Sequence, residues 1–371
     1  MVSSIDSQAA SAEYGLQSYI DTARDIATTT GGHSSIILGR MLLVKALFGL
    51  SGFEYGLYGL HSQPLSAIRG YRTKKQVTSL FLKVNPPAQR VKVDDKLLFH
   101  RLCEEANLPA PKLLAMLSAR RKNGAEQGID VFPDLASFIA QCDTRKPLDM
   151  IVKPRTDALG TGVRFVSIRD GQMFDVDRRP VEHRSFTEEL QCDMVRDDYL
   201  VQSFVRPHPA LATLGSGRAL GTFRIVTHAV QGRANILYAL FRIPSEGNAN
   251  DNFRAGASRN LIAGVDLASG VLSTAWGRPR RGTSRLLEAY DRNPETGVTI
   301  RGAQVPDWPA ICDVVKKAAV AFPELPCLGW DVAPSADGIV IIEANSNPDP
   351  MGGQVCLRKG SGVLLRPLGE G

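Results

Sequence analysis

The sequence predicts an α+β protein with a mainly helical N-terminal region. Two observations lead to this prediction. Residues 1–90 read as helical segments joined by glycine-rich turns, without alternating strands and helices. From residue 149 onward the pattern changes to short apolar strands separated by turns. The length of 371 residues suits two or three domains, and a content of 43% hydrophobic and 22% charged residues excludes a largely disordered chain.

The most apolar stretch of the N-terminal region spans residues 36–50. It is too short to cross a bilayer and contains Arg40 and Lys45. We therefore predict a helix that faces the core; attachment to a membrane interface is the alternative. The pair Pro86-Pro87 marks the boundary with the next segment.

Beyond this boundary the chain leads through one helix into the strand-rich part. Asp94 can cap a helix that ends before Pro109. A further helix is predicted around residues 311–321. Strands are predicted in seven segments: MIVKP, GVRFVSI, YLVQSFV, FRIVTHAV, ANILYALFRI, LGWDVAP and GIVIIEAN.

Composition limits the possible environments and partners. The six cysteines are scattered without a Cys-x-x-Cys pair, so we expect reduced thiols and a cytoplasmic location rather than a zinc or redox site. The N-terminus has no basic segment followed by an apolar run, so no secretory signal is expected. The net charge of +6 is only a weak indication of an anionic partner.

The strongest functional signal is a predicted hairpin within residues 328–353. If the hairpin turns about Asp337, Asp331 faces Glu343, and Asn345 projects from the same face as Glu343. Two carboxylates at this spacing repel each other unless a cation lies between them, and oxygen ligands suit Mg²⁺. The alternative is an exposed pair of acids. The metal site is favoured because Glu343 ends an apolar strand, where a carboxylate needs a partner.

A lysine and two glycines provide a possible phosphate site. Lys153 ends an apolar strand, and the loop that follows contains Gly160 and Gly162. A glycine-rich turn lets backbone N–H groups approach phosphate oxygens. The chain contains no Gly-Lys dipeptide, which excludes a P-loop.

Two arginines lie in neighbouring predicted strands. If that hairpin turns at residues 232–233, Arg224 and Arg242 are nearly opposite each other. They repel each other unless an anion lies between them. The anion is either a substrate or phosphate group, or a carboxylate of the protein itself; both interpretations stay open.

These motifs resemble the ATP-grasp superfamily. The segment IIEANSNPDPM is similar to the Glu-x-Asn-x-x-Pro ending of D-alanine–D-alanine ligases, and DDKLLFHRL to the helix that opens their ATP-binding region. The segments TFRIVTHAV, LYALFRI and DNFRAGAS resemble the Arg, Arg and Asn-x-x-x-Gly series of peptide glutamate ligases. The resemblance is greatest to the sugar-transfer associated, or α-L-glutamate ligase-related, ATP-grasp group, over residues 92–352. It implies a helical region at 1–91 and two lobes, 92–204 and 205–371, that clasp ATP.

The resemblance also implies roles for particular residues. For ATP they are Lys96 and Lys153 at the phosphates, Gly160 and Gly162 in a flap, and the backbone of Val201, Gln202 and Phe204 at the adenine. For Mg²⁺ they are Asp331, Glu343 and Asn345, and for the γ-phosphate and acyl substrate Arg224, Arg242 and Asn252. Gly329 stands where relatives commonly have an arginine before the first metal aspartate, so Arg224 would supply that charge.

The expected activity is an ATP-dependent carboxylate–amine ligase. A carboxylate would take the γ-phosphoryl group to give an acyl phosphate and ADP, and an amine would then displace phosphate. The expected partners are a small-molecule acid and amine, with no nucleic acid and no membrane insertion. The alternatives are a kinase that phosphorylates a small molecule or sugar, and a basic binding module without enzymatic activity.

Overall fold

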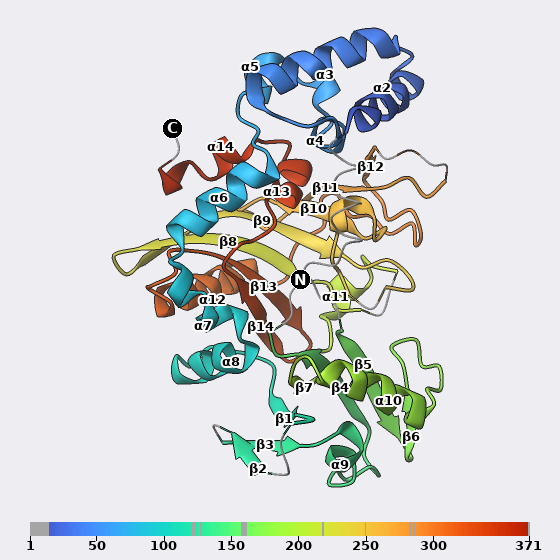
Figure 1. Ribbon diagram of the computed structural model, residues 1–371, viewed down its shortest axis with the longest axis vertical. Coiled ribbons are helices and arrows are strands. Elements are labelled where there is room, and N and C mark those ends of the chain that lie inside the picture. The colour runs from blue at the N-terminus through green and yellow to red at the C-terminus, as the bar shows by residue number, and fades with distance from the viewer. Residues whose placement is uncertain are drawn as a thin grey trace.

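The protein has a helical N-terminal region and two β-sheets, as the sequence predicts (Figure 1). Helices α2 to α5 lie at one end of the longest axis, the second sheet lies in the middle and the first sheet at the other end. The computed structural model describes residues 15–120, 124–126, 128–156, 162–216, 219–248, 250–281, 284 and 286–369. Within these ranges, no helix is long and apolar enough to cross a membrane.

From residue 15 on, where its description begins, the N-terminal region contains five α-helices. They are α2 (Leu16–Thr30), α3 (Ser34–Phe48), α4 (Gly52–Leu57), α5 (Leu65–Ile68) and α6 (Lys74–Val84), with a 3₁₀ turn at Leu60–Ser62. The predicted apolar helix is α3. The prediction that this helix faces the core holds only in part. Of its fifteen residues, only Met41 and Val44 are buried.

The first sheet has the strand order β2-β3-β1-β7-β4-β5-β6. Its strands are β1 (Leu113–Leu117), β2 (Gly124–Glu126), β3 (Ile129–Phe132), β4 (Leu148–Pro154), β5 (Arg164–Arg169), β6 (Gln172–Phe174) and β7 (Tyr199–Ser203). Helices α9 (Leu135–Ile139) and α10 (His183–Met194) share a core with one face. Met150 and Val152 point into that core, so Ile151 and Lys153 of β4 point to the opposite face.

Two helices precede this sheet, α7 (Val91–Asp94) and α8 (Lys96–Glu105). The predicted cap, Asp94, belongs to α7. The residue that caps α8 is its neighbour Asp95, whose carboxylate accepts hydrogen bonds from the N–H groups of Leu97 and Leu98. Lys96 therefore occupies the first turn of α8.

The second sheet is antiparallel, with the order β12-β11-β10-β9-β8-β13-β14. Its strands are β8 (Phe223–Val230), β9 (Arg233–Ile243), β10 (Leu261–Val265), β11 (Leu272–Gly277), β12 (Glu288–Tyr290), β13 (Cys327–Ser335) and β14 (Gly338–Asn345). The remaining helices are α11 (Pro209–Ala212), α12 (Trp308–Ala321), α13 (Pro350–Leu357) and α14 (Ser361–Leu364). Helix α12 packs on one face, and α13 shares a core with the N-terminal helices on the other.

A single asparagine ties the N-terminal region to the hairpin of β13 and β14. Asn85 is fully buried, and its side-chain amide donates to the carbonyl oxygens of Cys327 (2.6 Å) and Ser346 (2.7 Å). The side-chain oxygen of Asn85, Oδ1, accepts a hydrogen bond from the N–H of Cys327 at 3.1 Å. Both ends of the hairpin are thus held by one residue of the helical region. The division of the chain at residues 91 and 204 stays a prediction.

We expect the substitution Asn85→Ala to lower the free energy of unfolding by about 3 kcal/mol, because three buried backbone groups lose their partner. The control is Asn347→Ala, which removes an exposed asparagine and should change stability by less than about 0.5 kcal/mol. Urea unfolding of both variants measures the difference. Equal stability of the two variants would contradict the role of Asn85.

Candidate active site

The predicted pairing of the two carboxylates is confirmed by the hairpin register. Asp331 of β13 lies opposite Glu343 of β14. The turn is the two-residue pair 336–337, so the register near the turn differs by one from a hairpin centred on Asp337. A bulge after Asp331 adds one residue and restores the predicted partner at the site. Their role as metal ligands stays a prediction.

Asp331 is the centre of a buried ion cluster. Arg224 donates to both of its carboxylate oxygens, at 2.5 Å from Nε and 3.1 Å from Nη2, and Arg242 donates from Nη2 at 2.7 Å. Only 2% of Asp331 is exposed. Burial opposes its charge, but the two guanidinium groups outweigh burial and hold its pKa well below the ordinary value. The anion between the arginines is thus a carboxylate of the protein, one of the two alternatives left open by the sequence.

The two arginines are diagonal neighbours rather than opposite residues. Arg224 pairs with Leu240 of β9, so Arg242 lies two residues further along that strand and on the same face. The prediction of near-opposite arginines was wrong by two residues because the β8–β9 turn comes earlier, at residues 231–232; a bulge after Val226 recovers only one residue of the difference. The other partners of the Arg242 side chain are Thr222, Asp251 and Asn252.

Gly329 makes room for the Arg224 side chain. A Cβ atom at position 329 would lie 2.5 Å from Cβ of Pro348 and 3.2 Å from Cδ of Arg224. A larger residue there would displace both neighbours. The positive charge beside Asp331 is brought by Arg224 of β8, as the resemblance implied.

Glu343 differs from Asp331 in its surroundings. It is half-buried, and within the described residues it forms no ion pair with a lysine or arginine. Burial and the negative charge of Asp331 raise its pKa. Its Oε1 lies 3.4 Å from Nδ2 of Asn345. Three acceptor sites of Asp331 are taken by arginine, and Glu343 lies within hydrogen-bonding distance of the same carboxylate.

This donor set fits Mg²⁺. Two carboxylates in contact and one amide are hard oxygen ligands, and a divalent cation would relieve the repulsion between the acids. Among the described residues, no three His, Cys, Asp or Glu side chains form a self-contained metal site. The protein would thus supply few ligands, as is usual for Mg²⁺ that is bound together with phosphates and water.

The two predicted lysines face this group from the first lobe. Lys153 is buried on β4, and burial lowers its pKa to about 8, against the opposing charges of Glu343 and Asp331. Lys96 lies close enough for its charge to lower the pKa of both Lys153 and Glu343. The structure therefore brings both lysines, both arginines and both carboxylates together.

A second ion cluster, missed by the sequence analysis, holds the lysines in place. Arg155 donates to Asp95 from Nε at 3.0 Å and from Nη2 at 2.8 Å, and to Glu126 at 3.1 Å. The backbone N–H of Lys96 donates to the carbonyl oxygen of Arg155 at 3.0 Å. The end of β4 is thereby tied to the start of α8. Asp95 could have been found from the sequence, since it immediately precedes Lys96 in the Asp-Lys motif.

The predicted flap and hinge are only partly described. Gly160 lies outside the described residues. Gly162 has φ +73°, and a Cβ there would lie 2.9 Å from Oη of Tyr199, so only glycine fits without displacement. Val201 and Gln202 belong to the central strand β7, whose backbone pairs with β1 on one side and β4 on the other. The adenine base could bind the backbone groups of these two residues only if the hydrogen bonds between β7 and its neighbouring strands opened.

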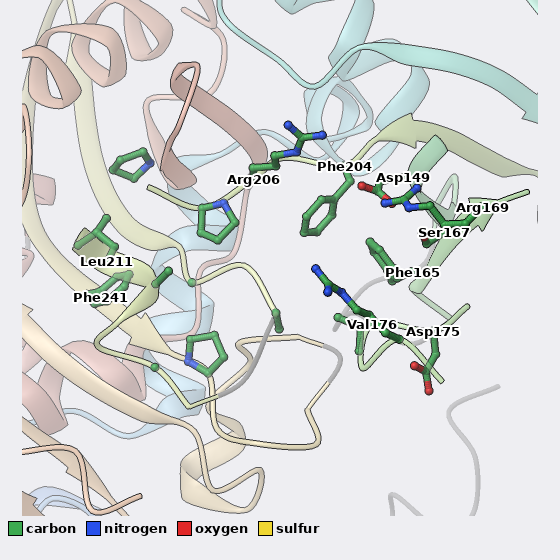
Figure 2. Close-up of a pocket in the computed structure, with 18 residues that line it drawn as sticks. Asp149, Phe165, Ser167, Arg169, Asp175, Val176, Phe204, Arg206, Leu211 and Phe241 are labelled. Atoms are coloured by element: carbon green, nitrogen blue, oxygen red, sulfur yellow. The ribbon is translucent and has the colours of Figure 1, made fainter. Parts of the chain in front are cut away.

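A cavity of about 450 Å³ opens between the lobes beside the end of β7 (Figure 2). Of the predicted site residues, only Phe204 lines it. Phe204 and Phe165 meet edge to face with ring centroids 4.9 Å apart, and the ion pair of Asp149 and Arg169 lies beside them. Asp149 lies on the same face of β4 as Lys153, four residues earlier, so the cavity and Lys153 are on one face of that strand.

The contrast between the two carboxylates gives a stability prediction. Asp331→Asn should lower the free energy of unfolding by about 3–5 kcal/mol, because two buried arginines lose their counter-charge. Glu343→Gln should leave stability unchanged or slightly raised at pH 8 without Mg²⁺, because the raised pKa of Glu343 means that its charged form weakens the fold above that pKa. Urea unfolding compares the variants. An equal loss in both would contradict the assigned difference.

Comparisons with known proteins give remote structural similarities. The chain is similar to the ATP-grasp ligase PsnB complexed with its minimal precursor, at 15% identity and a TM-score of 0.38, over 77% of this chain and 62% of that one. It is similar to the VanG D-Ala:D-Ser ligase from Enterococcus faecalis, at 12% identity and a TM-score of 0.41, over 85% of this chain and 68% of that one. A RimK domain ATP-grasp protein from Sphaerobacter thermophilus has 13% identity and a TM-score of 0.34, with coverage of 76% and 69%.

The match to the PsnB chain thus takes in under two thirds of its length. No curated protein matches the sequence. The family model of the sugar-transfer associated ATP-grasp proteins matches residues 75–366, which is well over half of the chain. The chain therefore belongs to the sugar-transfer associated ATP-grasp family.

Proposed function

We propose that the protein is an ATP-dependent ligase that joins a carboxylate to an amine through an acyl phosphate. The observation that supports this proposal is the convergence of Lys96 and Lys153 from one lobe on the carboxylate pair Asp331 and Glu343 of the other. Membership of an ATP-grasp family supports ATP as the phosphoryl donor. The structures that the chain resembles include ATP-grasp ligases, in agreement with amide formation.

In this proposal ATP lies along the face of β4. The adenine occupies the cavity beside Phe165 and Phe204, where an aromatic edge and face can contact a base. The distance along β4 from Asp149 to Lys153 is about 13 Å at 3.3 Å per residue, enough to bring the triphosphate to the lysines. Phe204, at the end of β7, would be the hinge residue that contacts the nucleotide.

The charges of the site suit a bound nucleotide. Glu343, Asn345 and Asp331 would hold Mg²⁺. When bound, the ion would neutralise negative charge on the phosphate oxygens. Lys96 and Lys153 bind phosphate oxygens from the other side. Arg242 and Asn252, which contact each other at 3.4 Å, face the acyl substrate. A protein catalyses phosphoryl transfer mainly by positioning the reactants and neutralising their charge.

The reaction consists of two substitutions. An oxygen of the acid attacks the γ-phosphorus, the bond between that phosphorus and the β–γ bridging oxygen breaks, and ADP leaves. The amine nitrogen then attacks the acyl carbon, the bond from this carbon to the phosphate oxygen breaks, and the amine proton leaves with phosphate. Lys153 stabilises the charge that develops on the transferred phosphoryl group.

An ADP-release screen across pairs of acids and amines tests the reaction type. We expect free phosphate to appear only when both an acid and an amine are present, with one amide formed per ADP. Glu343→Gln, which should keep the fold, provides the inactive control. A stable phosphorylated product that forms without an amine would refute the ligase and support a kinase.

The role of Lys153 gives a further prediction. Lys153→Met should lower Mg²⁺-dependent ADP formation about 100-fold or more, because a charge aimed at the transferring group is lost. The matched control is Lys83→Met, on the exposed side of α6, which should stay within about twofold of the unaltered protein. Steady-state kinetics with varied ATP measures both variants. A Lys153→Met enzyme with near-normal turnover would exclude this lysine from catalysis.

A further inference from the structure

Helix α3 carries an apolar surface that the rest of the described protein leaves uncovered. Ile36 is 68% exposed, Leu47 56% and Leu43 46%. These values are high for large aliphatic side chains that lie together on one helix. Figure 1 shows α3 at one end of the longest axis, with the second sheet between it and the first sheet.

The exposed side chains form one continuous face. At 100° per residue, they fall within an arc about 140° wide that contains no charged residue. The arc consists of Ile36, Gly39, Leu42, Leu43, Ala46 and Leu47, with Ser35 as its one polar residue. The two buried residues, Met41 and Val44, lie on the opposite face. A helix that is apolar on both faces needs an apolar environment on both sides, and the described residues provide only one.

The two basic residues of α3 lie outside this arc. The guanidinium group of Arg40 donates to the backbone carbonyl oxygens of His61 and Gln63. Lys45 lies over the ring of Tyr19, with Nζ 5.4 Å from its centroid. Helix α3 has no acidic residue. An apolar stripe bordered by basic groups is typical of helices that lie at a membrane surface.

The charge of the surrounding region identifies the partner. Residues 1–91 contain nine Lys and Arg against five Asp and Glu, a net charge of +4 out of the +6 of the whole chain. Exposed basic residues of the same region are Arg24 on α2, Arg69 just after α5, and Lys74 and Lys75 at the start of α6. A second copy of the chain would bring two such regions together, and they would repel each other. An anionic surface attracts both copies.

We propose that α3 binds in the interfacial plane of an anionic lipid bilayer, with its apolar face among the headgroups and upper acyl chains. The helix has fifteen residues and is about 22 Å long, which is shorter than the hydrocarbon core of about 30 Å, so it lies on the membrane and does not cross it. Because the first sheet is at the end of the molecule opposite α3, a bilayer bound at α3 lies away from the first sheet (Figure 1).

Vesicle flotation with the full chain tests this proposal without nucleotide or substrate. The probes are vesicles of phosphatidylcholine alone and of phosphatidylcholine with 30% phosphatidylglycerol. We expect at least tenfold stronger binding to the anionic vesicles, and a loss of binding in 0.5 M NaCl. The double variant Leu43→Glu/Leu47→Glu should bind at least tenfold more weakly, since charged side chains replace exposed leucines.

The control is Val195→Glu, which charges a residue of similar exposure (70%) at the end of α10 in the first lobe and should leave flotation unchanged. Both variants should keep normal circular dichroism and normal ADP formation, because none of these residues lies in the catalytic group. Absence of flotation by the unaltered protein, or equal flotation by the double variant, would overturn the proposal. A dimer that the double variant dissociates, without vesicle binding, would show instead that α3 joins two copies.

Discussion

The Asp331 carboxylate between two guanidinium groups is the interaction on which the second lobe depends. Taking three charges out of water is costly, and the cost is offset only where each charge meets its partner at hydrogen-bonding distance. Here that condition is met because β9, β8, β13 and β14 are adjacent and in a register that places Arg242, Arg224, Asp331 and Glu343 on one face. The row runs from positive to negative across four strands. If one of these strands shifted its register by one residue, its charged side chain would move to the other face of the sheet and point into an apolar core.

The other lobe is arranged to match this row. Its two lysines come from separate elements, β4 and α8, which are joined by the ion pair of Arg155 and Asp95 and by a backbone hydrogen bond. The hairpin that carries Glu343 is held at its open end by Asn85 of the helical region. The helical region therefore helps to hold the site in place, and it also shares a core with the second sheet. Its outer helix α3 takes no part in either contact, which is why its exposed face calls for a different partner.

Patterns in the sequence predicted those features of the structure that are set by residues close together in the chain. The Asp331–Glu343 pair could be found because a two-residue turn joins the two strands, and the bulge beside Asp331 compensated for the shifted turn. The arginine pair was misplaced by two residues because the β8–β9 turn comes earlier than expected, and the bulge after Val226 recovers only one residue of that difference. Contacts between distant segments could not be predicted: Asn85 and Cys327 are 242 residues apart in the chain. For α3 the apolar sequence predicted a helix, but both of its faces are apolar, so the pattern could not tell which face is covered.

The two acids of the hairpin have different tasks because their partners differ. Asp331 is neutralised by the protein, so its charge is already balanced before any ligand arrives. Glu343 has no arginine partner among the described residues, and its raised pKa reflects a charge that the fold alone does not compensate. A cation that enters the cleft is therefore attracted mainly by Glu343, while Asp331 keeps the arginines aimed along the sheet. By this reasoning the site is incomplete without its ligands at Glu343 and Lys153, whose pKa values burial moves towards neutrality.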